Sequence, residues 1–273
     1  MDYSKIFSLK DKVIVVTGGT GILGKAFVDG IISHGGIAII VGRNEAEGKK
    51  RVDEILTNGG EAMFVQTDVL NEQHVENLRD TVIEKYGRID GLVNGAGGNM
   101  PQGVIQHEED VFNMSIEGMK QVLDLNLWGT IIPTKILGAV MAKGKGGSIV
   151  NISSVSSKQV ITKVMGYSIG KAGVDCFTKW MAVEVANRHG DKLRINSIMP
   201  GFFLTEQNRK LLTNEDGSYT ERGGLVIKKT PYKRMGDPSE LVGALIYLLS
   251  DASKFVNGTD LAVDGGFTVF GGV

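Results

Sequence analysis

The chain has 273 residues, of which 42% are hydrophobic, a composition typical of a globular protein. Its 30 basic and 31 acidic residues give a net charge of −1, which argues against a nucleic-acid-binding surface. No apolar run reaches the roughly 18 residues of a membrane helix, and a lone cysteine, Cys176, allows no intrachain disulfide. We therefore expect a cytoplasmic protein with no membrane or nucleic-acid partner, and a buried thiol at Cys176 because its neighbours are apolar.

Short β-branched segments alternate with helical patterns along the chain. The expected strands are Val13–Thr17, Ile37–Val41, Ala62–Gln66, Gly91–Asn94, Ser148–Ile152, Arg194–Ile198 and Thr259–Val263. The expected helices lie near residues 22–34, 44–58, 71–86, 108–143, 166–188 and 238–250. Continuous apolar strands that alternate with helices indicate a parallel sheet covered on both faces.

We accordingly predict an α/β fold: a single doubly wound Rossmann domain over residues 1–273, with a seven-stranded parallel sheet and helices on both faces. Residues 202–236 interrupt the alternation and are rich in glycine, threonine and charge. Because loops this long are usually functional or disordered, we interpret the segment as an insertion that acts as a substrate lid.

A glycine-rich turn follows the first expected strand and leads into a helix. Glycines there let the backbone approach a pyrophosphate at the amide-rich start of the helix, although an ordinary strand-to-helix loop is the alternative. Ile22 is β-branched and does not readily take a positive φ, so we expect it to be helical, with Gly21 taking up the turn. The candidate cofactor-binding residues are Thr17, Gly18, Thr20, Gly21, Ile22 and Gly24.

The ends of the next three strands supply further candidates, since such strand ends line the ligand crevice of a doubly wound sheet. Arg43 stands where an acidic residue would hold the ribose of NAD, which gives a slight preference for NADP over NAD. The alternatives to cofactor binding are that Arg43 is a solvated surface residue, that Asp68 caps a helix and that the glycines only form a turn. The candidates are Arg43, Asn44, Asp68, Val69, Asn94, Ala96 and Gly97.

Tyr167 and Lys171 are four residues apart, which places a phenol and an ammonium on one helical face. A nearby cation lowers the pKa of a tyrosine from about 10 and makes its phenolate available as a general base. Ser154 stands 13 residues earlier, at the end of an expected strand, where its hydroxyl can bind a reacting oxygen. The three residues together suggest proton transfer to and from an alcohol or carbonyl.

These motifs, in this order and spacing, resemble the classical short-chain dehydrogenases/reductases over nearly the whole chain. The resemblance implies that Tyr167 is the acid/base, that Ser154 orients the substrate, and that Asn126 completes a proton relay with Lys171. It also implies that Tyr167 and Lys171 contact the cofactor, as do Pro200, Gly201, Phe203 and Thr205. The family's corresponding helices pair between subunits, which implies a homotetramer with Trp180 near the interface.

A closer resemblance is to the short-chain type D-mannonate oxidoreductases (fructuronate reductases), carried by Asn94–Asn99, Gly201–Arg209, Leu212–Ser218 and Thr220–Arg222. It implies interconversion of D-mannonate and D-fructuronate. A sugar acid needs polar groups and a cation, for which the candidates are Asn99, Lys158, Lys163 and Arg209.

Three alternatives stay open: a gluconate 5-dehydrogenase-like enzyme, another short-chain carbonyl reductase such as a 3-oxoacyl-carrier-protein reductase, and a non-catalytic cofactor-binding protein. No spacing of cysteine, histidine and carboxylate residues suggests a metal site.

Overall fold

The computed structural model describes residues 3–106 and 109–272. It contains a seven-stranded parallel sheet in the order β3-β2-β1-β4-β5-β6-β7, which confirms the predicted doubly wound α/β fold. The strands are β1 (Val13–Thr17), β2 (Ile37–Gly42), β3 (Glu61–Gln66), β4 (Gly91–Asn94), β5 (Gly147–Ile152), β6 (Leu193–Pro200) and β7 (Asp260–Val263). The strand order reverses between β1 and β4, and a crevice forms beyond the carboxyl ends of the strands at such a point.

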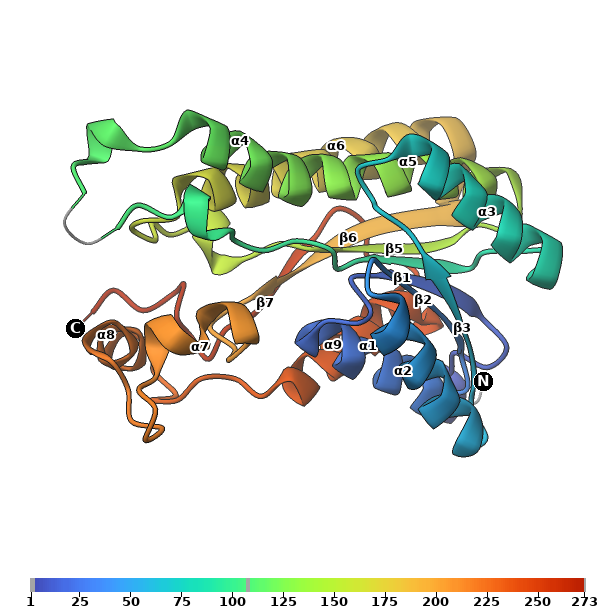
Figure 1. Ribbon diagram of the computed structural model, residues 1–273. Coiled ribbons are helices and arrows are strands. Elements are labelled where there is room, and N and C mark those ends of the chain that lie inside the picture. Colours follow the sequence, from blue (N-terminus) through green and yellow to red (C-terminus); the bar gives the residue numbers. More distant parts are fainter. Residues whose placement is uncertain (1–2, 107–108, 273) are drawn as a thin grey trace.

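Helices cover both faces of the sheet (Figure 1). One layer holds α1 (Ile22–Ser33), α2 (Glu45–Thr57) and α9 (Val242–Leu249), and the other holds α3 (Glu72–Tyr86), α4 (Ile116–Leu123), α5 (Gly129–Lys143) and α6 (Met165–His189). Short 3-10 helices occupy Tyr3–Lys5, Pro101–Gly103, Val111–Asn113, Val155–Ser157, Gly190–Lys192, Pro238–Leu241 and Asp251–Ser253.

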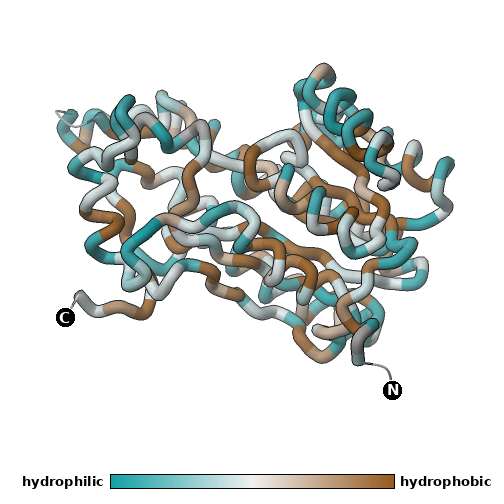
Figure 2. The backbone as a smooth tube through the Cα atoms, turned by 90° about the horizontal axis from the view of Figure 1, so that it is seen from below, coloured by the Kyte–Doolittle hydropathy of each residue, from teal (hydrophilic) through white to brown (hydrophobic). Residues whose placement is uncertain are grey.

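Two apolar clusters, one on each face of the sheet, form the core. In β1, Ile14 and Val16 belong to the cluster under α1 and α9, whereas Val13 and Val15 belong to the cluster under α3 and α5, because successive side chains of a strand point to opposite faces. The apolar strands accordingly run through the middle of the molecule, with hydrophilic segments of the helices outside them (Figure 2). Burial on both faces explains why the strands are continuously hydrophobic.

The helix expected over residues 108–143 is shorter than predicted. Residues 107–108 lie outside the described part, and the α-helix begins at Ile116, where the Ser115 side chain accepts a hydrogen bond from the backbone amide of Gly118. A π-helical turn, Asp124–Trp128, joins α4 to α5. Such turns are rare and frequently mark functional sites. The span Ile116–Lys143 is apolar and long enough to cross a membrane, but over half of its most apolar window is buried inside the protein, as in a core helix.

The segment over residues 202–236 is ordered rather than a bare loop. It contains α7 (Glu206–Leu212) and α8 (Glu221–Lys229), joined by a turn in which Thr213 pairs with Tyr219. Leu212, Val226 and Met235 form a small apolar core of their own. The two helices lie beyond the carboxyl ends of the strands, beside β7 in Figure 1. Their closure as a lid stays a prediction.

The expectation of a buried thiol at Cys176 is wrong, because this side chain is exposed on α6. Val174 and Ala182, on the same helix, are buried toward the sheet. The apolar run around Cys176 therefore does not belong wholly to the core.

Candidate active site

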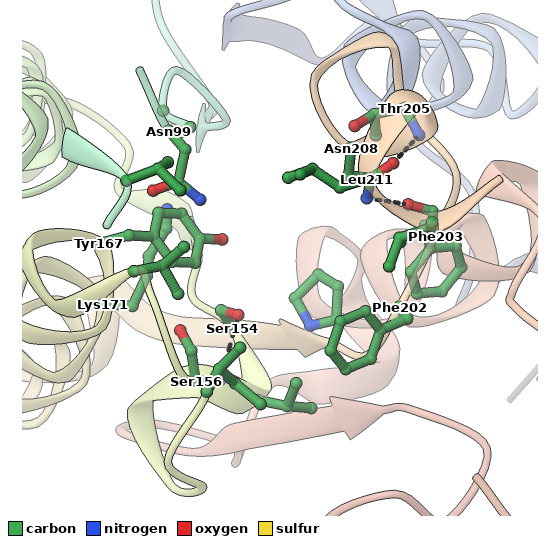
Figure 3. A pocket seen from close by; sticks show the side chains of 18 of the residues that line it. Asn99, Ser154, Ser156, Tyr167, Lys171, Phe202, Phe203, Thr205, Asn208 and Leu211 are labelled. Atoms are coloured by element: carbon green, nitrogen blue, oxygen red, sulfur yellow. Dashed lines mark hydrogen bonds between the residues drawn. The ribbon is translucent and has the colours of Figure 1, made fainter. Parts of the chain in front are cut away.

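A cavity of about 520 Å³ opens at the carboxyl ends of β4, β5 and β6. Asn99, Ser154, Ser156 and Tyr167 line one wall, and Phe202, Thr205, Asn208 and Leu211 line the facing wall, with open space between them (Figure 3). The first wall comes from the sheet and α6, and the second comes from the start of the lid segment and α7. The cavity thus lies where a doubly wound sheet is expected to bind its ligand.

Tyr167 and Lys171 enter the cavity from the first turns of α6. Lys171 is 4% exposed, and its Nζ donates a 2.7 Å hydrogen bond to the carbonyl of Ile152 and lies 5.6 Å from the centre of the Tyr167 ring. Burial lowers the pKa of Lys171 to about 8, which the charge of Asp175 partly opposes. Burial raises the pKa of Tyr167, and its hydrogen bond with Ser154 acts in the opposite direction. The structure therefore brings the predicted phenol, ammonium and hydroxyl together.

Ser154 follows the end of β5 in extended backbone and caps the 3-10 helix Val155–Ser157. Its Oγ accepts a 3.2 Å hydrogen bond from the backbone amide of Ser156 and faces the cavity beside Tyr167 (Figure 3). The buried Oγ of Ser156, two residues further along, has no hydrogen-bond partner within the described chain. Because buried hydroxyls are normally satisfied, Ser156 is a further candidate for a substrate contact, and the serine-rich run after β5 is its sequence signal.

Asn126 lies in the π-helical turn and is fully buried. Its Nδ2 donates to the carbonyls of Gly98 (2.8 Å) and Val122 (2.7 Å), and its Oδ1 accepts from the amide of Gly98 at 3.0 Å. A Cβ at Gly97 would lie 2.7 Å from the Asn126 Oδ1 and 3.1 Å from the Lys171 Nζ. Within the described residues no direct hydrogen bond joins Asn126 to Lys171. Because Asn126 bonds to Gly98 and Gly97 lies next to the Lys171 Nζ, Asn126 holds the loop after β4 against Lys171.

The glycine-rich turn has the shape that a pyrophosphate requires. A Cβ at Gly24 would lie 2.1 Å from the carbonyl oxygen of Gly18, so only glycine lets α1 start this close to the turn. Gly18 has φ +67° and takes the left-handed conformation in the turn, whereas Gly21, which was expected to take up the turn, is extended just before α1. Helix α1 begins at Ile22, as expected, and among the residues that the structure describes no side chain caps its N-terminus. These backbone amides therefore fit the phosphates of a dinucleotide.

The other expected cofactor residues divide into two groups. Arg43 and Asn44 are exposed beyond β2, and Thr20 lies against Gly42. In contrast, Asn94 donates to Thr134 and Asn151 at 2.8 Å inside the core, so its side chain does not reach the crevice.

Three further residues predicted to bind the cofactor also make contacts within the protein. Thr17 is buried, and its Oγ1 accepts from the amides of Gly95 and Ala96, which fixes the loop after β4. Asp68 accepts from the amide of Leu70 in a local turn, and Val69 is buried near Gly129.

The segment after β6 reaches the cavity as expected. Pro200, Gly201, Phe203 and Thr205 all line it. A Cβ at Gly201 would lie 2.7 Å from the Cα of Asp264, so the glycine allows β6 and the chain after β7 to pass closely. Leu23, Phe202 and Asn208 also line the cavity and were not singled out by the sequence pattern.

The structure brings only one of the four expected substrate residues, Asn99, into the cavity, and the Asn99 Oδ1 is buried without a partner in the described chain. Lys158 instead pairs with Asp175 at 2.9 Å and Asp260 at 3.1 Å, outside the cavity. Lys163 has φ +74° and also does not line the cavity. Arg209 is exposed on the outer side of α7 and is likewise not a lining residue.

Besides Lys171, the described cations that line the cavity include Arg222, near the start of α8. Its guanidinium donates to the carbonyl oxygen of Thr162 at 3.0 Å and to the Thr162 Oγ1 at 3.2 Å. Burial lowers the pKa of Arg222, and no carboxylate pairs with it in the described ranges 3–106 and 109–272. The sequence carries a signal for it, since Thr220–Arg222 is part of the closer resemblance, but sequence does not show which lid cation faces inward.

A doubly wound sheet with a glycine-rich first turn and a serine, tyrosine and lysine around one cavity defines a nicotinamide-dependent oxidoreductase. A family model described as enoyl-(acyl carrier protein) reductase matches residues 20–268. The chain belongs to the short-chain dehydrogenase/reductase family and is an NAD(P)-dependent oxidoreductase.

Among similar proteins, the uncharacterized oxidoreductase UxuB of Bacillus subtilis is 38% identical over 97% of this chain and 98% of its own length. The 2-dehydro-3-deoxy-D-gluconate 5-dehydrogenase of Escherichia coli is 32% identical over 96% of this chain and 97% of its own.

Two solved structures show both nicotinamide cofactors in such a fold. A candidate D-mannonate oxidoreductase of Haemophilus influenzae with bound NAD has a TM-score of 0.89 and 33% identity, and covers all of both chains. A gluconate 5-dehydrogenase of Burkholderia cenocepacia in complex with NADP and tartrate has a TM-score of 0.86 and 30% identity, over 97% of this chain and 98% of the other.

Proposed function

We propose that this enzyme interconverts the alcohol and ketone forms of a sugar acid, with D-mannonate and D-fructuronate as the preferred pair. One observation carries the proposal: the described side chains that line the cavity include the cations Lys171 and Arg222 and no aspartate or glutamate. Such a cavity favours an anionic ligand, and Asn99, Ser156 and Asn208 offer polar contacts for its hydroxyls. The similarity to a candidate D-mannonate oxidoreductase supports the same substrate class.

Bound NAD(P) supplies the hydride transfer at the carbinol carbon. In oxidation, Tyr167 accepts the hydroxyl proton at its phenol oxygen, and in reduction it returns that proton to the carbonyl oxygen. Ser154 donates a hydrogen bond to the same substrate oxygen as charge develops on it. The Lys171 ammonium stabilises the phenolate of Tyr167.

Asn126 acts by position in this scheme. It holds the backbone of Gly98 on both its donor and its acceptor side, and so fixes the loop after β4 next to Lys171. The proton relay through Asn126 and Lys171 that the family resemblance implies stays part of the proposal. The cofactor would lie along the turn Thr17–Gly24, the loop at Ala96 and Gly97, and the segment Pro200–Thr205.

We also propose a preference for NADP over NAD, which rests on Arg43. It is exposed beyond the end of β2, and no acidic residue stands at that position to hold a ribose. The second candidate substrate is gluconate, favoured by the similarity to an NADP-bound gluconate 5-dehydrogenase. A 3-oxoacyl-carrier-protein substrate is disfavoured because Arg222 leaves a charged group in the cavity. A non-catalytic protein is disfavoured because the serine, tyrosine and lysine are all in place.

Arg222→Ala is expected to raise the KM for D-mannonate about tenfold or more, the scale of one charged hydrogen bond at about 1.5–3 kcal/mol. The KM for the cofactor should stay unchanged, because Arg222 lies on α8, outside the segments proposed to hold the cofactor. The measurement is initial-rate kinetics with a panel of sugar acids and uncharged polyols, each with NAD and with NADP, followed by nicotinamide absorbance.

Arg209→Ala is the matched control, since Arg209 is a lid cation outside the cavity, and its kinetic constants should match those of the unsubstituted enzyme. Equal losses on charged and uncharged substrates in Arg222→Ala would mean that Arg222 supports the lid rather than a carboxylate. Absence of turnover with every sugar acid in the unsubstituted enzyme would overturn the substrate class itself.

We further propose that the protein is a homotetramer in the cytoplasm. Large apolar side chains are exposed on the π-helical turn and α6, among them Trp128, Trp180 and Val183. A groove of about 380 Å³, lined largely by apolar side chains, lies between α5 and α6, and large exposed apolar surfaces mark interaction sites. Sedimentation velocity should show a single tetrameric species at micromolar concentration, and a stable monomer there would contradict the proposal.

A further inference from the structure

A row of alternating charges leads from the surface of the protein to Lys171. Lys179 on α6 pairs with Asp260 at 2.7 Å, Asp260 pairs with Lys158 at 3.1 Å, and Lys158 pairs with Asp175 at 2.9 Å. The two lysines are partly exposed, with side-chain exposures of 52% for Lys179 and 38% for Lys158, whereas the two carboxylates are buried, at 9% for Asp260 and 5% for Asp175. None of these four residues lines the catalytic cavity.

Asp175 follows Lys171 by one turn of α6, so both side chains lie on the same buried face of the helix. Taken as a whole residue, each is only 4% exposed. The Asp175 Oδ1 accepts a hydrogen bond from the hydroxyl of Ser153, which immediately precedes Ser154. A buried carboxylate thus stands directly behind the catalytic ammonium and is tied to the serine end of the same site.

The other charged groups on the elements around Lys171 are remote or accounted for. On α4 and the π-helical turn, Glu117, Lys120 and Asp124 are exposed, and on α5 Lys135 and Lys143 are exposed. On β6, Arg194 donates to Ser250 and Ser253. Tyr167 on α6 and Arg222 from α8 share the cavity with Lys171. The buried carboxylate that faces Lys171 from its own helix is that of Asp175.

We propose that Asp175 is a positioning residue for the reaction, whose buried carboxylate keeps Lys171 in its charged form, and that Lys158 limits this effect by pairing with the same carboxylate. The proposal rests on the assignment of Tyr167 and Lys171 as the acid/base pair.

The physical reason is that burial opposes an isolated ammonium. Burial lowers the pKa of Lys171 to about 8, and the charge of Asp175 acts against that shift. Although burial also acts to lower the pKa of Lys158, hydrogen bonds to Asp175 and Asp260 raise it well above its ordinary value, so Lys158 stays charged as a permanent counter-ion. Removing the charge of Asp175 should therefore lower the pKa of Lys171, and removing the charge of Lys158 should raise it.

The test titrates Lys171 directly in the cofactor-free protein, by NMR of the lysine side chains, with the Lys171 signal identified by its loss in Lys171→Met. Asp175→Asn keeps the size and the hydrogen bond to Ser153 but removes the charge, and should lower the midpoint by about one pH unit. Lys158→Met keeps the aliphatic stem and should raise the midpoint. Lys179→Met is the matched control, because it removes an exposed charge that pairs with Asp260 and not with Asp175, and should leave the midpoint in place.

The same variants are then assayed for carbonyl reduction with NADPH and D-fructuronate, which needs both Tyr167 and Lys171 protonated. The high-pH limb of the profile should move down in Asp175→Asn and up in Lys158→Met. A purely structural role would lower rates in both variants without opposite displacements, and that outcome, or an unmoved Lys171 midpoint, overturns the proposal. If the two variants shift the midpoint of the Lys171 titration in opposite directions but the protein reduces no carbonyl, the charge coupling would be supported and the proposed function would fail. If Asp175→Asn does not fold, Lys158→Met alone tests the proposal: a rise in the midpoint of the Lys171 titration supports it, and an unchanged or lower midpoint overturns it.

Discussion

Tyr167→Phe is expected to lower turnover by about 10²- to 10⁴-fold, the range typical of a removed general acid/base, while cofactor affinity changes little. The substitution deletes one hydroxyl and keeps the ring. Because the Lys171 Nζ is held by the carbonyl of Ile152 at 2.7 Å, its position does not depend on that hydroxyl. The loss should therefore fall on kcat in both directions of the reaction.

The measurement pairs steady-state kinetics with cofactor titration by fluorescence. Tyr86→Phe is the matched control, since Tyr86 ends α3 and does not line the cavity, and it should retain the turnover of the unsubstituted enzyme. Turnover in Tyr167→Phe within a few-fold of the unsubstituted enzyme would refute the acid/base assignment.

Lys171→Met is expected to lower alcohol oxidation at neutral pH by about 10- to 10³-fold, which corresponds to a rise of one to three units in the pKa of Tyr167. Burial already raises that pKa, and the neighbouring ammonium is the cation placed to oppose it. Below a pH of about 8, Lys171 carries its charge, so the difference between the two proteins should be largest there. It should narrow as the pH rises, because the phenolate of the variant then forms without help.

The check is the pH profile of oxidation from about pH 6 to 11 in both proteins. The optimum of Lys171→Met should lie at higher pH. A uniform loss with an unchanged profile would assign Lys171 to cofactor binding rather than to the ionisation of Tyr167. A matched control is Lys179→Met, two turns further along α6, which should leave the profile unchanged.

Much of the fold could be predicted because the signals are local. Every expected strand appears within two residues of its observed ends. The inner strands are the clearest of them, because a strand buried on both faces is a continuous apolar run. The prediction of a helix over residues 108–143 was wrong at its start, because Ser115 caps α4 and a 3-10 turn precedes it. The periodicity of apolar residues reports neither feature. The prediction that Cys176 is buried was wrong for a related reason: an apolar run on a helix does not show which face of the helix packs on the sheet.

By itself, the sequence determined the doubly wound architecture, the glycine turn and the juxtaposition of Tyr167 with Lys171, because each depends on backbone period or on spacing within one element. The tertiary structure decided which polar groups share the cavity. Lys158 and Arg209 are turned away from it and Arg222 faces it, although all three are near the site along the chain. The orientation of these side chains depends on how α8 packs on α7 and on which carboxylates form ion pairs with Lys158. Contacts between segments far apart in sequence set both.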